Sequence, residues 1–381
     1  MAEPRPIALD DLRPRLERAL EFAARQVRGT IERTPNFFPI YTVGGRWKHG
    51  GELWTDWCAG LHAGMMWLLA ARTGDPWWRH QAEHYSRLIE PKQHDRNVHD
   101  LGFIFLNTYL PWYERTGDEH LRQVLIAAGR TLALRFMPKG QYLRSFVAPE
   151  SLFIDIMMNV PLIFYAARAT RDRALFDLAV AHCRTTERTL VGPDGGTAHE
   201  GLFDLETGAF LRESTHQGLR PGSDWSRGLA WSLYGFGTVS TTTHDPVDLA
   251  VARRNADHFL ARLPESFVPP WDFDVPDGPD RIADSSAGAI AASGLWNLAE
   301  LTRPGDPAAA ARYRNAALSI LDALLTDDYV AWNTPGWEGV LKHGVYHVHK
   351  QLGVDESVMW GEFFFLEAVA KALRAATSAP A

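Results

Sequence analysis

The sequence predicts an all-α fold, an (α/α)6 barrel in which helical hairpins close into a ring, with elaborated loops and at most a small β-hairpin. Short phrases that combine a helix-ending residue with an aspartate recur along the chain, and each aspartate precedes an alanine-containing apolar segment. Glycine ends helices and aspartate caps the helix that follows, so each phrase predicts the turn of a hairpin. The phrases are Thr73-Gly74-Asp75, Thr116-Gly117-Asp118, Thr170-Arg171-Asp172, Thr243-His244-Asp245 and Pro304-Gly305-Asp306.

The ends of the chain complete the expected ring. An apolar stripe at helical spacing begins at Leu9 and runs to Val27, which predicts an amphipathic first helix. A last helix is expected over Ser357–Thr377. The uneven spacing of the turns excludes an open solenoid, whose repeats keep one period. Together these segments predict about twelve helices in one domain over residues 1–381.

Strand signals are few, and the best predicts a hairpin around Glu206-Thr207-Gly208, with Phe203 and Phe210 beside the turn. Three loops rich in Pro, Gly and Asp are long for a compact domain: Thr34–Gly51, Val191–Ser223 and Pro264–Asp284. Long loops on a rigid scaffold often carry function, so we expect the functional site beside them.

Composition excludes several classes of protein. With 46% hydrophobic and 22% charged residues among 381, the chain is globular and not disordered or collagen-like. A net charge of −7 predicts no nucleic-acid or anionic-lipid partner. Two cysteines, Cys58 and Cys183, favour a reducing compartment, and a charged N-terminal segment without long apolar runs predicts a cytoplasmic protein with no membrane span. The 14 tryptophans suggest stacking on sugar rings.

Two carboxyl groups stand in apolar surroundings. Asp100 lies in His99-Asp100-Leu101-Gly102-Phe103, and Asp155 lies in Phe153-Ile154-Asp155-Ile156-Met157-Met158-Asn159. Burial raises the pKa of a carboxyl group and favours the protonated form that a general acid needs, and a second carboxylate nearby raises it further. The alternative is that Asp100 caps a helix and Asp155 binds a neighbouring loop.

A histidine and a polar run are the next candidates. His199 follows the glycine-rich turn Asp194-Gly195-Gly196, either reaching over a cavity or lying on the surface. The run from Gln217 to Trp231 brings together Gln217, Trp225, Arg227 and Trp231, which suits a carboxylate-bearing sugar. The alternative makes Arg227 a structural ion pair and both tryptophans part of the core.

Nucleotide-binding and serine-hydrolase motifs do not occur in the sequence. His343, His347 and His349 cluster in sequence, but they lack an acidic partner at metal-binding spacing, so we expect no metal and no organic cofactor.

Taken together, these motifs resemble the unsaturated glucuronyl hydrolases, glycoside hydrolase family 88. The resemblance runs from Trp54 to Glu367 and includes both acid-bearing segments. Further matching features are Trp54-Thr55, Gly64-Met65-Met66-Trp67, Asp194 to His199, Gln217-Gly218, Ser226-Arg227-Gly228, Tyr234-Gly235-Phe236, Asp284-Ser285-Ser286 and Leu366-Glu367-Ala368.

The resemblance implies an (α/α)6 barrel and a substrate made by polysaccharide lyases, an oligosaccharide ending in a 4,5-unsaturated uronic acid. It assigns to Asp155 the protonation of C4 and the activation of water, and to Asp100 the role of second carboxylate. It assigns His199 and Gln217 to the uronate ring, Arg227 to polar anchoring, and Trp54, Trp225 and Trp231 to stacking and the pocket walls.

Three positions depart from the family pattern. Leu61-His62 replaces Phe-Trp, Phe146 stands where a pocket tryptophan is expected, and Glu362 replaces an Asp. We hypothesise that His62 and Phe146 adapt the pocket to a substituted or differently linked uronate. An unsaturated rhamnogalacturonyl-type hydrolase, an (α/α)6 sugar isomerase or epimerase, and a non-catalytic glycan-binding protein stay open as alternatives. The sequence does not reveal the parent polysaccharide or the oligomeric state.

Overall fold

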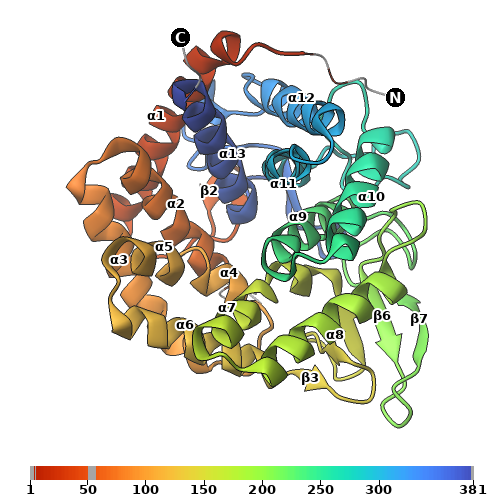
Figure 1. The fold of residues 1–381 in the computed structure, drawn as a ribbon. Helices are drawn as coiled ribbons and strands as arrows, with labels where there is room; N and C mark the ends of the chain where they lie inside the picture. The colour runs from red at the N-terminus through yellow and green to blue at the C-terminus, as the bar shows by residue number, and fades with distance from the viewer. Residues whose placement is uncertain (1–3, 5, 50–56, 379–381) are drawn as a thin grey trace.

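The computed structural model describes residues 4, 6–49 and 57–378, and within them the helices form two concentric layers (Figure 1). The inner layer comprises α2 (Cys58–Thr73), α4 (Leu101–Phe105) continued by α5 (Tyr109–Thr116), α7 (Pro161–Thr170), α9 (Ser226–Thr243), α11 (Ser285–Thr302) and α13 (Met359–Ser378). The outer layer comprises α1 (Leu9–Arg33), α3 (Pro76–Ile89), α6 (Glu119–Ala133), α8 (Arg173–Leu190), α10 (Pro246–Arg262) and α12 (Pro307–Leu324). The predicted barrel of helical hairpins is confirmed.

The hairpin turns form as the recurring phrases predict. Asp75, Asp118, Asp172, Asp245 and Asp306 are each the N-cap of the following outer helix, and each side chain accepts a backbone N–H of the first turn. At the first four turns the residue before the aspartate adopts the left-handed conformation. These caps satisfy N–H groups that a helix end leaves without partners.

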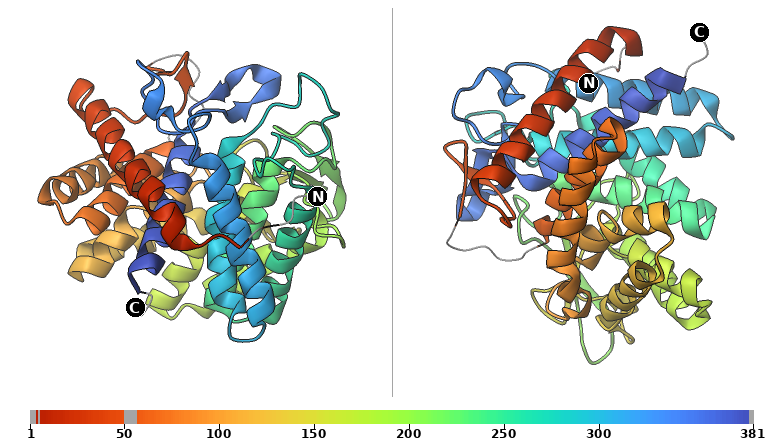
Figure 2. Two further views of the ribbon diagram at one scale, coloured as in Figure 1. Left: turned by 90° about the horizontal axis from the view of Figure 1, so that it is seen from above. Right: turned by 90° about the vertical axis from the view of Figure 1, so that its left-hand side faces the viewer.

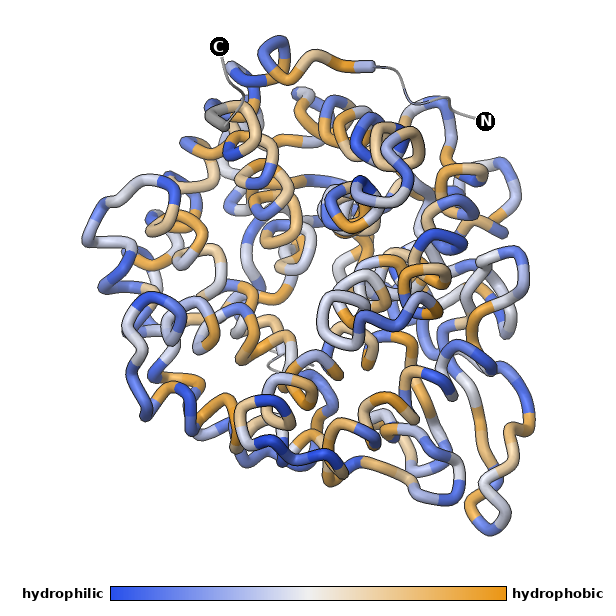
Figure 3. The backbone as a smooth tube through the Cα atoms, in the orientation of Figure 1, coloured by the Kyte–Doolittle hydropathy of each residue, from blue (hydrophilic) through white to orange (hydrophobic). Residues whose placement is uncertain are grey.

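The two layers differ in burial because of their position. Inner helices are buried on most sides and carry small side chains, as in α11, where Ala, Gly and Ser dominate the buried positions. Outer helices bury one face, and hydrophilic segments lie mainly on their outward side (Figure 3). The buried apolar side chains belong to one cluster that extends around the ring.

The β-structure exceeds the single hairpin expected. The predicted hairpin is present as β6 (Glu200–Phe203) and β7 (Phe210–Ser214), and β5 (Ser151–Phe153) adds a third, antiparallel strand to β6. Three further two-stranded hairpins are β1 (Thr42–Val43) with β2 (Arg46–Trp47), β3 (Phe136–Met137) with β4 (Tyr142–Leu143), and β8 (Gly344–His347) with β9 (Leu352–Glu356). The strands β1 to β4 have only two residues each, which leaves too short an alternating pattern to be read from the sequence.

Short 3-10 helices connect several elements: η1 (Glu90–His94), η2 (Ile154–Met158), η3 (Ala331–Asn333) and η4 (Val348–Lys350). The β1–β2 and β8–β9 hairpins stand at one end of the helical ring (Figure 2). At that end the chain enters the inner helices α4, α7 and α9, so residues of their first turns can meet there. None of the helices in the described ranges has the length and apolar character needed to cross a membrane.

Candidate active site

Asp100 lies at the start of the inner helix α4. It occupies the N-cap position, but its side chain makes no capping hydrogen bond. The residue is only 5% exposed, and it lines a small cavity at this end of the barrel. The alternative that Asp100 serves as a helix cap is therefore wrong, and its carboxyl group faces the cavity.

Asp155 reaches the same cavity from η2, directly after β5. Strand β5 pairs with β6, and the N–H of Ile154 donates to the carbonyl of His199 at 3.0 Å. This pairing places Asp155 and His199 side by side, with 3.6 Å between Asp155 Oδ2 and His199 Nε2. A strand pairing between distant segments thus joins two residues that the sequence separates.

The two acid-bearing segments are held together by Asn159 and Gly102. Asn159 Oδ1 accepts the N–H of Phe103 at 2.9 Å, while its Nδ2 donates to the carbonyl of Asp155 at 3.1 Å. A Cβ at Gly102 would lie 2.4 Å from the Cα of Asn159. Only glycine permits this close backbone approach, so Gly102 and Asn159 fix the separation of the two carboxyl groups.

The cavity has a volume of about 30 Å³, enough for a water molecule. Five of the predicted site residues line it: Asp100, Phe146, Asp155, Gln217 and Arg227. The other lining residues among those described are Trp57, His99, Phe103, Phe153 and Tyr346. Carboxyl, guanidinium and amide groups therefore converge between aromatic side chains, as in a polar-ligand pocket.

Both carboxyl groups have a raised pKa. Burial raises the pKa of Asp100 to about 8, with a further contribution from the charge of Asp155. Burial also raises the pKa of Asp155 to about 6, partly opposed by the positive Arg227. Two carboxylates in one small, enclosed cavity disfavour the doubly ionised state, so the pair retains a proton near neutral pH.

Two neutral histidines face the two acids. The Nδ1 of His199 accepts the backbone N–H groups of His216 at 3.1 Å and Gln217 at 3.2 Å. A ring nitrogen that accepts N–H bonds has no proton, so the proton is on Nε2, the atom that faces Asp155. His99 repeats this arrangement, because its Nδ1 accepts the N–H of Phe146 and its Nε2 lies 3.5 Å from Asp100 Oδ1. Burial lowers the pKa of both histidines, which keeps them neutral.

Arg227 combines a structural and a cavity role. Its guanidinium donates to the carbonyl groups of Val345 and Tyr346 in β8 and to Oε1 of Gln217. It also lies 3.8 Å from Asp284 Oδ2, the structural ion pair that we weighed as an alternative. The remaining positive charge faces the cavity beside Asp155, where it can attract an anionic group.

The predicted tryptophans lie in different places. Trp225 is buried against the ring of His199, with centroids 4.4 Å apart, and beneath the Arg227 guanidinium. Trp231 is core, because it packs between Phe103 and Phe364 and does not line the cavity. Neither Trp225 nor Trp231 lines the cavity, so the structure does not place either of them in the predicted stacking position on substrate. Trp54 lies outside the described residues.

His62 does not reach the cavity, which corrects the expectation that it shapes the pocket. It is 1% exposed and packs edge-on against Tyr85 and Phe38, at centroid distances of 5.6 and 6.3 Å. Neither ring nitrogen has a hydrogen-bond partner among the described residues, and burial lowers the pKa of His62 to about 3. Its side chain points to the interface with α3, a direction that only the helix packing determines.

Three cavity residues were not predicted from the sequence: His99, Trp57 and Tyr346. His99 could have been found, because it directly precedes Asp100. Trp57 stacks on Trp360 at a centroid distance of 5.0 Å and contacts Phe103. Tyr346 comes from β8, more than a hundred residues after Arg227. Neither residue belongs to a recognisable motif, and tertiary packing alone brings them to the acids.

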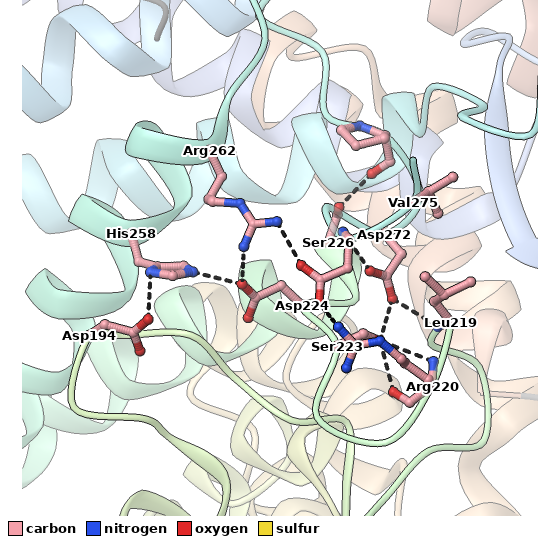
Figure 4. Close-up of polar contacts among 12 residues, drawn as sticks. Asp194, Leu219, Arg220, Ser223, Asp224, Ser226, His258, Arg262, Asp272 and Val275 are labelled. Carbon is pink, nitrogen blue, oxygen red and sulfur yellow. Dashed lines mark hydrogen bonds and ion pairs between the residues drawn. The ribbon is translucent and has the colours of Figure 1, made fainter. Parts of the chain in front are cut away.

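Ion pairs and hydrogen bonds hold the loop that carries His199 and Gln217 (Figure 4). Asp224 Oδ2 lies 2.7 Å from both His258 Nε2 and Arg262 Nη1 on α10, and Asp224 Oδ1 accepts the N–H of Thr197 at 3.0 Å. Asp272 supports the same loop, since its Oδ2 accepts the N–H of Leu219 and the hydroxyl of Ser223. The outer helix thus positions the segments on either side of the site.

Within the described ranges, no group of three or more His, Cys, Asp or Glu side chains is arranged to hold a metal ion. His343 Nδ1 lies 2.6 Å from Asp355 Oδ1, whereas His349 Nε2 lies 2.8 Å from the carbonyl of Gly218. These two histidines of the C-terminal cluster therefore serve separate contacts.

Comparison with known proteins identifies relatives over most of the chain. A sequence model of Glycosyl Hydrolase Family 88 matches residues 41–246. An unsaturated glucuronyl hydrolase from Bacillus sp. (strain GL1) is 35% identical over 333 residues, which cover 85% of this chain and 88% of that protein. An unsaturated chondroitin disaccharide hydrolase from Streptococcus pneumoniae (strain ATCC BAA-255 / R6) is 30% identical, covering 83% of this chain and 81% of that protein.

Solved structures agree with this result. The crystal structure of the Bacillus sp. GL1 unsaturated glucuronyl hydrolase superposes with a TM-score of 0.88 at 31% identity, covering 95% of this chain and 98% of that one. An unsaturated glucuronyl hydrolase described as specific for heparin also gives a TM-score of 0.88, at 27% identity, covering 96% of this chain and 98% of that one. From its sequence and its fold, this chain belongs to glycoside hydrolase family 88.

Proposed function

We propose that this enzyme removes a 4,5-unsaturated uronic acid from the non-reducing end of lyase-generated oligosaccharides by hydrating the C4=C5 enol ether. The observation that carries the proposal is the convergence of Asp100 and Asp155, both with raised pKa, in one cavity with Arg227. The names of the relatives support the substrate class, since they are unsaturated glucuronyl and chondroitin disaccharide hydrolases.

The proton chemistry falls to Asp155. Its protonated carboxyl donates to C4, which leaves oxocarbenium character at C5. The resulting carboxylate takes a proton from the water that attacks C5, and the hemiketal then opens and releases the remaining glycan. A pKa of about 6 makes both forms of Asp155 accessible near neutral pH. The two carboxyl groups do not act as in retaining and inverting glycosidases, because the anomeric carbon is not attacked.

The other polar groups fit substrate binding. Asp100 has the higher pKa of the two acids, so its protonated carboxyl can both donate to and accept from ring hydroxyls. The Nε2–H of His199 can donate to the ring beside Asp155. Arg227 and Gln217 supply charge and an amide for the uronate carboxylate, and Phe146 supplies an aromatic face. Trp225 supports His199 and Arg227 from beneath.

The sugar isomerase alternative loses support, whereas the unsaturated rhamnogalacturonyl-type hydrolase is included in the test below. A sugar isomerase would be favoured by histidine bases in the cavity with Asp155 turned away, but Asp155 lines the cavity. An unsaturated rhamnogalacturonyl-type substrate stays an alternative within the same chemistry. Cys58 and Cys183 are buried and form no disulfide within the described residues, which is compatible with our expectation of a cytoplasmic location.

The direct test is loss of the ultraviolet absorbance of the conjugated double bond. The substrates are lyase-produced disaccharides from chondroitin, hyaluronan, heparin and gellan, together with unsaturated galacturonyl-rhamnose. We expect decay on at least one uronyl-hexosamine or uronyl-glucose substrate. Asp155→Asn should reduce the rate about 10²–10⁴-fold with binding retained, because the amide keeps the shape but cannot transfer the proton.

Asp172→Asn is the matched control, since it makes the same substitution at a hairpin turn where asparagine also caps a helix. It should retain full activity. Decay only on the galacturonyl-rhamnose substrate would favour the alternative, and full activity of Asp155→Asn would remove that residue from the mechanism.

A further inference from the structure

A second and much larger cavity occupies the other end of the barrel interior. Its volume is about 1000 Å³, at the upper end of the range for small-molecule sites. Helix α9 shows the separation, because Arg227 in its first turn lines the small cavity whereas Tyr234, Thr238 and Thr241 further along line the large one. Phe103 borders both cavities, so its ring lies between them.

The walls combine aromatic rings with uncharged polar groups. Four of the rings belong to Phe103, Tyr113, Tyr165 and Phe364, and Thr238 and Asn297 are among the polar residues. Tyr113 and Tyr165 line this cavity and are only partly buried, so their hydroxyl groups can bind a ligand. Burial raises the pKa of Tyr165 to about 12, and its neutral hydroxyl can both donate and accept.

The charged groups around this cavity are largely compensated. Glu367 accepts from Tyr234 at 3.0 Å and from Lys371 at 3.0 Å. Arg122 pairs with Glu119 at 2.6 Å, and Glu300 pairs with Arg303 at 2.8 Å. Glu114 and Arg168, which are both exposed, add one charge of each sign to the lining. No excess of one sign is left to attract an ion.

The rings of Phe103 and Phe364 are buried, whereas those of Tyr113, Tyr165 and Tyr234 are only partly buried. Such aromatic faces with neutral donors and acceptors match the two surfaces of a sugar, its apolar C–H face and its hydroxyl groups. We infer that this cavity is a second, non-catalytic binding site for a neutral saccharide. The inference does not depend on the proposed reaction, because none of the residues that carry it belongs to the catalytic cavity except the shared wall at Phe103. Two motifs that the catalytic site leaves unused, those of Tyr234 and Glu367, meet here.

The test is calorimetric titration of the full chain with D-glucose and N-acetyl-D-glucosamine, with glucuronate and glucosamine as charged analogues. We expect the neutral sugars to bind with Kd of about 1 mM, roughly −4 kcal/mol. The charged analogues should bind at least tenfold more weakly, because a charge would lose hydration without gaining a partner.

Thr238→Trp fills the cavity and should weaken sugar binding at least tenfold. Val247→Trp is the matched control, since it adds the same side chain at an exposed position of α10. It should bind sugar as the unmodified protein does, and so should Gln217→Ala, which alters only the catalytic cavity. Turnover of unsaturated disaccharides, measured separately, should persist in Thr238→Trp.

Failure of a neutral sugar to bind the folded protein at 50-fold above that Kd, about 50 mM, would overturn the inference. So would equal binding by Thr238→Trp, or loss of binding in Gln217→Ala, which would locate the sugar in the catalytic cavity. Tyr165→Phe is a milder second variant that removes only a hydroxyl. Where Thr238→Trp fails to fold, unchanged affinity in Tyr165→Phe overturns the inference, and a several-fold loss supports it.

Discussion

At the scale of single residues, each of the two acids proposed to be catalytic, Asp100 and Asp155, lies beside a histidine whose proton position is set by the backbone. The N–H groups that His199 and His99 accept at Nδ1 belong to the loops that line the cavity. Each Nε2–H is therefore directed at a carboxyl group. In the proposed reaction the histidines contribute hydrogen-bond donors, and proton transfer falls to an acid, because burial raises the pKa values of Asp155 and Asp100 to about 6 and about 8.

The pH dependence of turnover follows from these pKa values. The acid form of Asp155 is lost as pH rises through about 6, and that of Asp100 as pH rises through about 8. We expect kcat/KM to fall above pH 6 and more steeply above pH 8, measured from the absorbance assay between pH 5 and 9. Asp100→Asn should abolish the second decline and keep the first. A flat profile from pH 5 to 8 would contradict these assignments.

His62 predicts an effect on stability and not on specificity. In the unfolded chain a histidine has a pKa of about 6.5, whereas in the fold the pKa of His62 is lowered to about 3. Protonation of His62 therefore favours the unfolded chain. The pH-dependent part of the unfolding free energy that comes from His62 is fully present above pH 6.5 and is lost as pH falls toward 3.

His62→Leu keeps an apolar volume and removes this penalty and the unbonded ring nitrogens. We expect a gain of about 1–3 kcal/mol in unfolding free energy, increasing toward low pH. Denaturant unfolding at pH 5 and pH 8 would measure it. Relative rates across the disaccharide panel should not change. A changed ranking of the substrates would show that His62 does affect specificity.

At the scale of elements, the outer helix α10 controls a loop of the inner site. Asp224 is the link, since it binds two cationic side chains of α10 and the backbone of Thr197, two residues before His199. The pKa of His258 is raised by its hydrogen bond to Asp224. This part of the stability is thus present below pH 6.5 and is lost as pH rises through the raised pKa of His258.

Replacing Asp224 should disturb substrate positioning. We expect Asp224→Asn to lower kcat/KM about tenfold, mainly through KM, and to destabilise the fold by about 2–4 kcal/mol, because Arg262 and His258 lose their shared anion. Steady-state kinetics and thermal unfolding would measure the two effects. Asp306→Asn is the control, because Asp306 caps α12 and accepts a hydrogen bond from Arg253 of α10 at 2.7 Å. This variant should leave KM unchanged. An unchanged KM in Asp224→Asn would limit the network to a structural role.

At the scale of the whole molecule, one buried apolar cluster extends from α1 to α13. The first and last helices close the ring by packing against each other, and α13 also packs against α2 and α11. Closure makes each hairpin depend on two neighbours, in contrast to an open solenoid, whose terminal repeats can unfold alone.

We therefore expect one cooperative unfolding transition for the whole chain, as for a single domain over residues 1–381. Differential scanning calorimetry would show one peak with equal calorimetric and van't Hoff enthalpies. Glu362→Gln should move that whole peak to lower temperature, because the buried Glu362 carboxyl accepts the N–H groups of both Val340 and Leu341. Two separable peaks would contradict the single-domain prediction.

The helical hairpins could be predicted from the amino-acid sequence alone, because capping and helix termination are local. Asp75, Asp118 and the later aspartates cap the helices that follow them, whatever the path of the rest of the chain. The turn around Gly208, which joins β6 to β7, is likewise formed by local residues. The sequence also singled out Asp100 and Asp155, since a carboxyl group within an apolar segment is unusual in any fold.

Which side chains lie together in the site could not be predicted from local patterns, because it depends on how distant segments pack. Residues separated by about fifty positions, such as Asp100 and Asp155, share a cavity because Gly102 and Asn159 allow two backbone segments to touch. His62 and Trp231 carry side chains that suit a pocket, but both are buried between helices, in the core. The direction of a side chain on a helix buried on all sides depends on its neighbours, and no local pattern encodes that.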